Sequence, residues 1–244
     1  MESNPYLNVV ANLLDRIELT QCESFQKAAV LIKSAIDQGG VLHVFSTGHS
    51  HMMVEELFYR TGGLVPVNPI FDPATMLHEG ASKSTRLERL EGYASILFDT
   101  VDTRAGEVIL IVSNSGINAV PVEMAQKARK KGLVVIALTS VSISSQLASR
   151  ASSGLRLMDV ADLVIDNCVE GCDAAIEIDD KGGRAGAVST IAGAYIAQRI
   201  VLEVINEYKK CGQPPLIFMS ANVPGGDQWN KDLVQKYKSR IKFL

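Results

Sequence analysis

The sequence predicts an α/β fold in which a parallel β-sheet lies between two layers of helices. Uninterrupted apolar segments recur at residues 41–45, 108–112 and 133–138, as expected for strands that are buried on both faces. Segments with helical spacing alternate with these strands, and this alternation is typical of a doubly wound sheet. Apolar residues make up 47% of the 244-residue chain, which is enough for a sizeable core.

The composition excludes several classes of function. The formal net charge is −3 and both signs are well mixed, so no basic surface for nucleic acid or an anionic membrane is expected. The longest uncharged segment, Gly132 to Ser149, is interrupted by the hydroxyl side chains of Thr139, Ser140, Ser142, Ser144 and Ser145, which argues against a membrane span. No basic stretch followed by an apolar one opens the chain, so we expect no signal peptide and a cytoplasmic protein.

Cofactor and metal motifs are absent from the sequence. Neither GxGxxG nor GxxxxGK[ST] occurs, which disfavours dinucleotide binding and nucleotide hydrolysis. No CxxC pair is present, so we expect no metal site and no cofactor. The four cysteines are expected to be reduced thiols, and they are Cys22, Cys168, Cys172 and Cys211.

The N-terminal region, residues 1–40, is predicted to be a helical arm. Apolar residues recur with amphipathic spacing through residues 5–38, and Gly39-Gly40 ends the helix. Because this helix precedes the first strand, it makes no crossover between strands. It packs either across its own domain or against a second subunit.

The first half of the expected sheet contains two strands and a polar loop. Residues 41–45 form the first strand, in which His43 is either a hydrogen-bonded core residue or a catalytic one. A polar turn at 46–51 leads into a helix that extends to about Arg60. Residues 64–71 form a short strand weakened by prolines, residues 73–84 a polar loop, and residues 86–101 a helix.

The second half repeats the pattern of strand, turn and helix. The strand 108–112 breaks into Ser113-Asn-Ser-Gly116, and Asn118 is the expected N-cap of a helix at 119–131. Strands follow at 133–138 and 159–166, with a further candidate at 175–178 and a mobile or ligand-shaped loop at 182–186. A long helix at 187–209 precedes residues 211–244, read as an extended tail and a polar terminal helix.

Two of these turns predict an anion site. Each follows a buried strand and leads into a helix, so backbone N–H groups and hydroxyls converge where the helix dipole favours negative charge. Parallel strands place both turns at the carboxyl edge of the sheet, where α/β folds bind ligands. The expected anion is a phosphate. The alternative is an ordinary turn with a serine cap.

These segments together resemble the SIS (sugar isomerase) domain, a family that binds phosphosugars. Ser113-Asn-Ser-Gly-Ile-Asn118 is similar to the phosphate loop of the family, and Thr47-Gly-His-Ser50 to its first glycine–serine loop. Residues 147–148 and 160–165 resemble the segment before its fourth strand, and residues 187–190 resemble the opening of its last helix. The resemblance covers roughly residues 35–210, and residues 41–210 are expected to form the phosphosugar-binding domain.

The resemblance implies the architecture and the ligand contacts. The family fold is a three-layer αβα sandwich with a five-stranded, flavodoxin-like parallel sheet, usually in a homodimer or homotetramer. The resemblance implies that the phosphate is held by Ser50, Ser113, Ser115, Asn118 and a backbone N–H of Asn114. The sugar is bordered by the remaining predicted contacts, which are Ser46, Thr47, Gly48, Ser189 and Thr190.

The residues for proton transfer are less clearly marked. Residues 78–82 resemble a loop of arabinose-5-phosphate isomerases with altered spacing, which implies Glu79 as base and His78 as acid. Glu56 is the next candidate, and Glu55 and His51 are further ones. Arg60 and Gln198 fall near the positions of the catalytic glutamate and histidine of phosphoheptose isomerases, so the usual pair is absent.

Three functions fit this pattern. The first is a metal-independent aldose–ketose isomerase acting on a phosphorylated sugar or amino sugar. The others are an amino-sugar-phosphate lyase or etherase, and a non-catalytic sugar-phosphate sensor. Direct DNA binding by a sensor is not expected, because only one long helix precedes the first strand.

Overall fold

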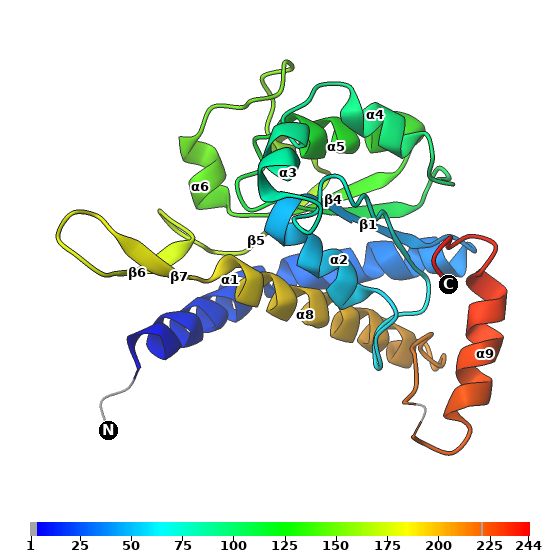
Figure 1. The fold of residues 1–244 in the computed structure, drawn as a ribbon. Helices are drawn as coiled ribbons and strands as arrows, with labels where there is room; N and C mark the ends of the chain where they lie inside the picture. Colours follow the sequence, from blue (N-terminus) through cyan, green and yellow to red (C-terminus); the bar gives the residue numbers. More distant parts are fainter. Residues whose placement is uncertain (1–3, 221) are drawn as a thin grey trace.

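The computed structural model describes residues 4–220 and 222–244. Residues 1–3 of the predicted arm and residue 221 of the predicted tail lie outside this range. Within it, a five-stranded parallel sheet is flanked by helices on both faces (Figure 1), as predicted. The strand order is β2-β1-β3-β4-β5, the flavodoxin-like order.

The strands of the central sheet match the apolar segments of the sequence. They are β1 (Leu42–Ser46), β2 (Val67–Pro69), β3 (Val108–Val112), β4 (Val134–Thr139) and β5 (Leu163–Asp166). β1, β3 and β4 are almost wholly buried, which explains their continuous apolar sequences. β2 is shorter than the predicted 64–71 and lies at an edge of the sheet, where prolines are tolerated.

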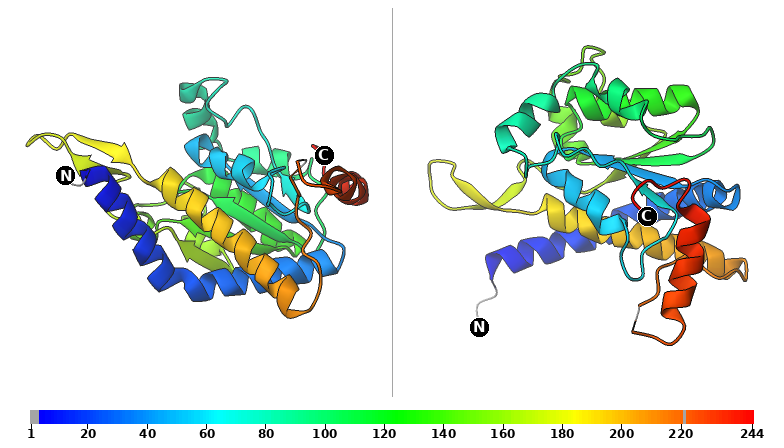
Figure 2. Two further views of the ribbon diagram at one scale, coloured as in Figure 1. Left: turned by 90° about the horizontal axis from the view of Figure 1, so that it is seen from below. Right: turned by 45° about the vertical axis from the view of Figure 1, so that its right-hand side comes forward.

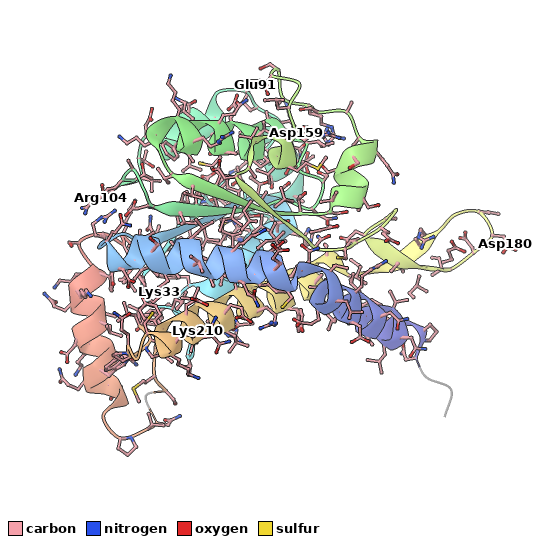
Figure 3. All side chains as sticks on the ribbon, turned by 180° about the vertical axis from the view of Figure 1, so that it is seen from behind. Lys33, Glu91, Arg104, Asp159, Asp180 and Lys210 are labelled. Carbon is pink, nitrogen blue, oxygen red and sulfur yellow. The ribbon has the colours of Figure 1, made fainter. Side chains whose placement is uncertain are left out.

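One face of the sheet is covered by α1 (Pro5–Asp37), α2 (Met52–Leu57) and α8 (Ser189–Lys210). Figure 2 shows α1 and α8 side by side across this face. The Glu18 carboxylate accepts hydrogen bonds from Tyr195 and Arg199. Lys33, labelled on α1 in Figure 3, lies over the ring of Tyr208. The predicted helix at 5–38 is therefore confirmed, and it packs on the sheet of its own chain.

The opposite face carries α4 (Tyr93–Phe98), α5 (Ala119–Lys131) and α7 (Leu157–Val160), with α3 (Ala81–Leu87) and α6 (Val141–Gln146) beside it. α5 ends at Gly132, which has a φ of 88°, after three basic residues in the last turn. Its bounds agree with the predicted helix at 119–131.

The predicted continuous helix at 86–101 is wrong, because the chain breaks between α3 and α4. In an unbroken helix the Gly92 N–H would donate to the Glu88 carbonyl. Instead Gly92 has a φ of 81° and donates to the Glu123 carboxylate, while the Glu88 carbonyl accepts from Val120 N–H at 3.1 Å. Both partners of the helical hydrogen bond are thus engaged elsewhere.

Two smaller predictions also need correction. The helix after the first strand ends at Leu57 and not near Arg60, because Phe58 is extended and Tyr59 has a φ of 48°. The predicted loop at 182–186 is partly β7 (Arg184–Ala187), which pairs antiparallel with β6 (Ala174–Glu177). This hairpin is separate from the main sheet, and Asp180 lies at its tip (Figure 3).

The C-terminal segment folds back onto the amino end of the sheet. α9 (Gly226–Tyr237) stands beside the domain (Figure 2), and its apolar side chains share a small core with the start of β1. This cluster contains Val41, Val65, Phe218, Leu233, Tyr237 and Ile241. The predicted terminal helix is therefore confirmed.

Candidate functional site

The register of the sheet places the carboxyl ends of four strands next to one another. Ser46 pairs with Val112, Val112 with Leu138, and Thr139 with Asp166. The loops that follow β1, β3, β4 and β5 therefore leave the sheet at one level, at its carboxyl edge. This is where the sequence predicted a ligand site.

The 113–118 loop presents unused backbone donors at the start of α5. Ser113 Oγ accepts from Gly116 N–H at 3.2 Å and so shapes the turn, in which Gly116 has a φ of 65°. Within the described residues, the N–H groups of Asn114, Ser115, Ile117 and Asn118 donate to no protein acceptor. Converging free N–H groups at a helix N-terminus form an anion-binding site.

Two contacts close this loop from its outer side. Arg150 donates its backbone N–H to the carbonyl of Ile117 at 2.8 Å and its guanidinium to Asn118 Oδ1 at 2.9 Å. Asn118 therefore orients a cation next to the loop. The expected N-cap hydrogen bond from its side chain is not made.

The 46–51 loop is fixed mainly by its own polar side chains. Ser46 Oγ donates to the Val112 carbonyl at 2.8 Å, and Thr47 Oγ1 donates to Glu88 Oε2 at 3.0 Å. Gly48 has a φ of 58° and donates its N–H to the Thr75 carbonyl. Ser46 and Thr47 are thus engaged with the protein, while Ser50 faces a pocket.

A small pocket of about 20 Å³ lies between these loops and the start of α8. It is lined by Ser50, Met53, Val112, Asn114, Leu138, Asn167, Ser189 and Thr190. Four of the predicted ligand contacts therefore line one pocket, and they are Ser50, Asn114, Ser189 and Thr190. They come from three distant parts of the chain. Asn167 was not predicted, and it donates to Asn114 Oδ1 at 2.7 Å.

The start of α8 is held by an aspartate. Asp173 accepts hydrogen bonds from the N–H groups of Val188 and Ser189 and from the Ser189 hydroxyl. This carboxylate fixes Ser189 and leaves the neighbouring Thr190 as a pocket-lining hydroxyl.

The predicted proton-transfer residues lie outside the lining of this pocket. Glu79 is exposed and pairs with Lys83 at 2.6 Å, and its hydrogen bond with Lys83 lowers the pKa of its carboxyl. His78 is exposed as well. Glu56 accepts from Gln198 at 2.7 Å and from Arg60 at 2.8 Å.

The remaining candidates differ in burial. Glu55 is exposed on α2. His51 is buried, its Nδ1 is 3.2 Å from the Ser46 carbonyl oxygen, and burial lowers the pKa of its ring. His43 is buried at the opposite end of β1, bonded to Glu107 and Asn68, and is therefore a hydrogen-bonded core residue.

Two charged residues that contact the site's loops, Glu88 and Arg150, were not predicted, and neither lines the pocket itself. Glu88 is in a charged segment that reads as the surface of a helix, and only Gly92 signals that the helix ends there. Arg150 directly follows the uncharged segment Gly132 to Ser149, which is the one local signal of its role.

The residues that the structure describes do not meet the requirements of a metal site, a disulfide or a membrane span. Among residues 4–220 and 222–244, no three His, Cys, Asp or Glu side chains gather as a metal site would require. The cysteines, all four of them, carry free thiols. None of the helices in the described ranges is long and apolar enough to cross a membrane.

The sequence matches a family model and is similar to known proteins over nearly its whole length. The family model for the SIS domain matches residues 5–140. A UPF0309 protein of Thermoanaerobacter pseudethanolicus is 42% identical over 243 residues, covering 98% of both chains. A UPF0309 protein of Listeria innocua is 39% identical over 241 residues, covering 99% of this chain and 98% of the relative.

Solved structures share the fold at low sequence identity. A phosphoheptose isomerase from Francisella tularensis matches with a TM-score of 0.54 and 13% identity, over 82% of this chain and 95% of its own. The Vibrio vulnificus NanR protein complexed with ManNAc-6P matches with a TM-score of 0.53 and 15% identity, over 94% of this chain and 67% of the NanR chain.

Proposed function

The chain belongs to the SIS-domain family, and from this premise we propose that it binds a phosphorylated sugar or amino sugar at the carboxyl edge of its sheet. The reaction that we propose is a metal-independent aldose–ketose isomerisation. The observation that carries the proposal is the 113–118 loop, which lines the pocket at Asn114 and has four N–H groups without an acceptor among the residues that the structure describes.

In this proposal each polar residue of the site has a distinct part. Ser115, Ser50 and the N–H of Asn114 bind the phosphate, while Ser113 and Asn118 shape the loop and orient Arg150. The Arg150 guanidinium adds positive charge beside the dianion. Hydrogen bonds between charged groups are stronger than neutral ones, so this cation contributes substantially to affinity.

The sugar itself lies along the first loop and the start of α8. Ser46, Thr47 and Gly48 border it on one side, and Ser189 and Thr190 on the other. Two of the compared structures support a ligand of this class, because one is a phosphoheptose isomerase and the other is complexed with ManNAc-6P, an amino sugar phosphate.

Isomerisation requires an ionised base and an acid near the carbonyl group. The family resemblance nominates Glu79 as base and His78 as acid, with Glu56 next. The ion pair of Glu79 with Lys83 keeps its carboxylate charged at neutral pH, as a base requires.

A non-catalytic sensor is the second candidate. Gln198, near the position of the histidine of the phosphoheptose isomerases, has an amide that cannot transfer a proton at neutral pH, and it binds Glu56. A sensor would bind a sugar phosphate without changing it. An amino-sugar-phosphate lyase or etherase would use the same phosphate contacts.

The binding proposal is tested by thermal shift with five-, six- and seven-carbon sugar phosphates and with glucosamine 6-phosphate, because ligands of the folded state raise its melting temperature. We expect at least one of them to bind. Ser115→Ala and Arg150→Gln should each weaken binding by about tenfold or more, the effect of losing one charge-assisted hydrogen bond.

The matched control is Lys131→Gln, which removes one positive charge at the far end of α5. It should leave affinity for the same sugar phosphate unchanged. Equal affinity of Ser115→Ala, Arg150→Gln and the wild type would contradict the proposed phosphate site.

A further inference from the structure

Glu88 is held at the edge of the proposed site by three neighbouring segments. Its carboxylate lies against the 46–51 loop, where Oε2 accepts from Thr47 Oγ1 at 3.0 Å. A Cβ added to Gly48 would lie 3.9 Å from the same oxygen, so only bare backbone faces the carboxylate there. The Glu88 carbonyl accepts from Val120 N–H in the first turn of α5.

The backbone of Glu88 is anchored as firmly as its side chain. Glu88 N–H donates to the Ser84 carbonyl at 3.0 Å, and Ser84 Oγ donates to the Thr75 carbonyl at 2.6 Å. Thr75 in turn accepts from Gly48 N–H. Glu88 therefore keeps a fixed position relative to the two loops that form the proposed phosphate and sugar contacts.

The second carboxylate oxygen of Glu88 is available to a ligand. Across the described ranges, Oε1 accepts no hydrogen bond, and Glu88 forms no ion pair within 4.0 Å. The side chain is half-buried, so it is partly shielded from water but still reachable. The carboxylates of Glu79 and Glu56, in contrast, are both occupied by cations.

The electrostatics of Glu88 suit proton transfer. Burial raises the pKa of this carboxyl above its ordinary value, while the Thr47 hydroxyl and the charges of Arg89 and Arg150 hold it down. A base with a raised pKa accepts a proton from carbon more readily than one with a low pKa. The exposed Glu79 has its pKa shifted the other way by Lys83.

From this geometry we infer that Glu88 is the catalytic residue that moves the proton between adjacent sugar carbons, and that Thr47 is its positioning residue. The inference rests on the proposed function. An open-chain sugar phosphate bound at the 113–118 loop extends beyond its phosphate, and Glu88 borders the 46–51 loop, along which the sugar is proposed to lie.

The proton balance of the step is simple. The ionised Glu88 removes the proton on the carbon next to the carbonyl, the C–H electron pair forms a carbon–carbon double bond, and the carbonyl oxygen takes up a proton, giving an enediol. Protonated Glu88 then returns its proton to the neighbouring carbon. The hydroxyl on the carbon that Glu88 first deprotonated then loses its own proton and becomes the new carbonyl. The step therefore needs no oxidant or reductant.

The test measures exchange of that carbon-bound hydrogen with deuterium from solvent, by NMR, using fructose 6-phosphate, ribulose 5-phosphate, sedoheptulose 7-phosphate and glucosamine 6-phosphate as probes. Glu88→Gln keeps the size of the side chain and an acceptor for Thr47 but removes the ionisable group. We expect exchange to fall by about 10²–10⁴-fold. The thermal shift by the same probe should be kept.

Glu79→Gln and Glu88→Asp are the comparison variants. If Glu79→Gln loses exchange while Glu88→Gln retains it within threefold, the inference is overturned and the isomerase proposal stands. Glu88→Asp keeps a carboxylate that is one methylene shorter, and exchange that is partly recovered relative to Glu88→Gln supports proton transfer over a structural role.

The wild-type result distinguishes the isomerase proposal from the proposal of sugar-phosphate binding. Binding without exchange for every probe overturns both Glu88 as catalytic residue and the isomerase proposal, and leaves a sugar-phosphate sensor. Failure of every probe to bind overturns the proposed function itself. Binding with exchange that depends on Glu88 supports both.

Discussion

His43 in β1 and Glu107 just before β3 are joined by a buried hydrogen bond of 2.8 Å between Nε2 and Oε2. Glu107 also accepts from the guanidinium of Arg240 at 2.7 Å and from the N–H groups of Val41 and Arg104. Arg240 follows α9, so this carboxylate fixes the C-terminal segment to the amino end of the sheet.

Glu107 makes the stability of the protein sensitive to pH in the acidic range. Burial opposes its ionisation, but hydrogen bonds from His43, Arg240 and Arg104 outweigh burial and lower the pKa to about 2 from an ordinary 4.5. A carboxyl with a depressed folded-state pKa contributes stability above the unfolded value and loses it as pH falls through the folded value. We therefore expect the free energy of unfolding to fall between about pH 4.5 and pH 2.

Glu107→Gln should lower the free energy of unfolding at pH 7 by about 3–5 kcal/mol, because it removes the buried anion of Arg240 and leaves it only the exposed Asp102. The variant should also lose less stability than the wild type on acidification. Urea unfolding at pH 7, 4.5 and 3 measures both effects. Parallel curves for the two proteins would show that Glu107 is not the titrating group.

Phe25 tests whether α1 belongs to the core of the domain. It is 0% exposed and packs in the cluster between α1, α8 and the sheet, whereas Leu19 on the same helix is 84% exposed. Phe25→Ala should cost about 3–5 kcal/mol, and Leu19→Ala about 0.5 kcal/mol or less. A small loss for Phe25→Ala in thermal or urea unfolding would indicate an independent arm.

Gly116 tests the conformation of the 113–118 loop. Its φ is 65°, and an added Cβ would lie 3.0 Å from Thr139 Oγ1 and 3.3 Å from Leu157 Cβ. Gly171 has a similar φ of 63° with no atom within 4 Å of an added Cβ. Both alanine variants should lose about 1–2 kcal/mol of stability from the left-handed backbone.

Only Gly116→Ala should weaken sugar-phosphate binding, because only its methyl group displaces the loop. Isothermal titration with the best probe of the panel measures this difference. Equal loss of affinity in both variants would mean that the loop does not hold the ligand.

Thr47 tests the pH dependence of the proposed reaction. Its hydroxyl donates to Glu88 and lowers the pKa of that carboxyl, so Thr47→Val should raise the pKa. A base works only when ionised, and the acidic limb of kcat/KM should therefore move to higher pH. Thr85→Val, an exposed change on the neighbouring α3, is the control and should leave the profile in place.

Much of the fold could be read from the sequence because burial dictates composition. β1, β3 and β4 are apolar along their whole length, and polar turns mark their carboxyl ends. The grouping of Ser50, Asn114, Ser189 and Thr190 followed from the family resemblance. It required no knowledge of the register.

What could not be read depends on contacts between distant residues. The break at Gly92 arises because Glu123 and Val120, some thirty residues later, take over its helical hydrogen bond. The same break turns Glu88 from a helix surface residue into one that faces Thr47. Local spacing contains no trace of either contact.

The packing of α1 against α8 also constrains how the protein is made. α1 is synthesised well before α8, yet Glu18 and Lys33 find their partners in residues 195–208. Until α8 has been synthesised, the apolar side of α1 therefore lacks the helix that completes its burial. Since domains fold as units, the final native packing waits for α8.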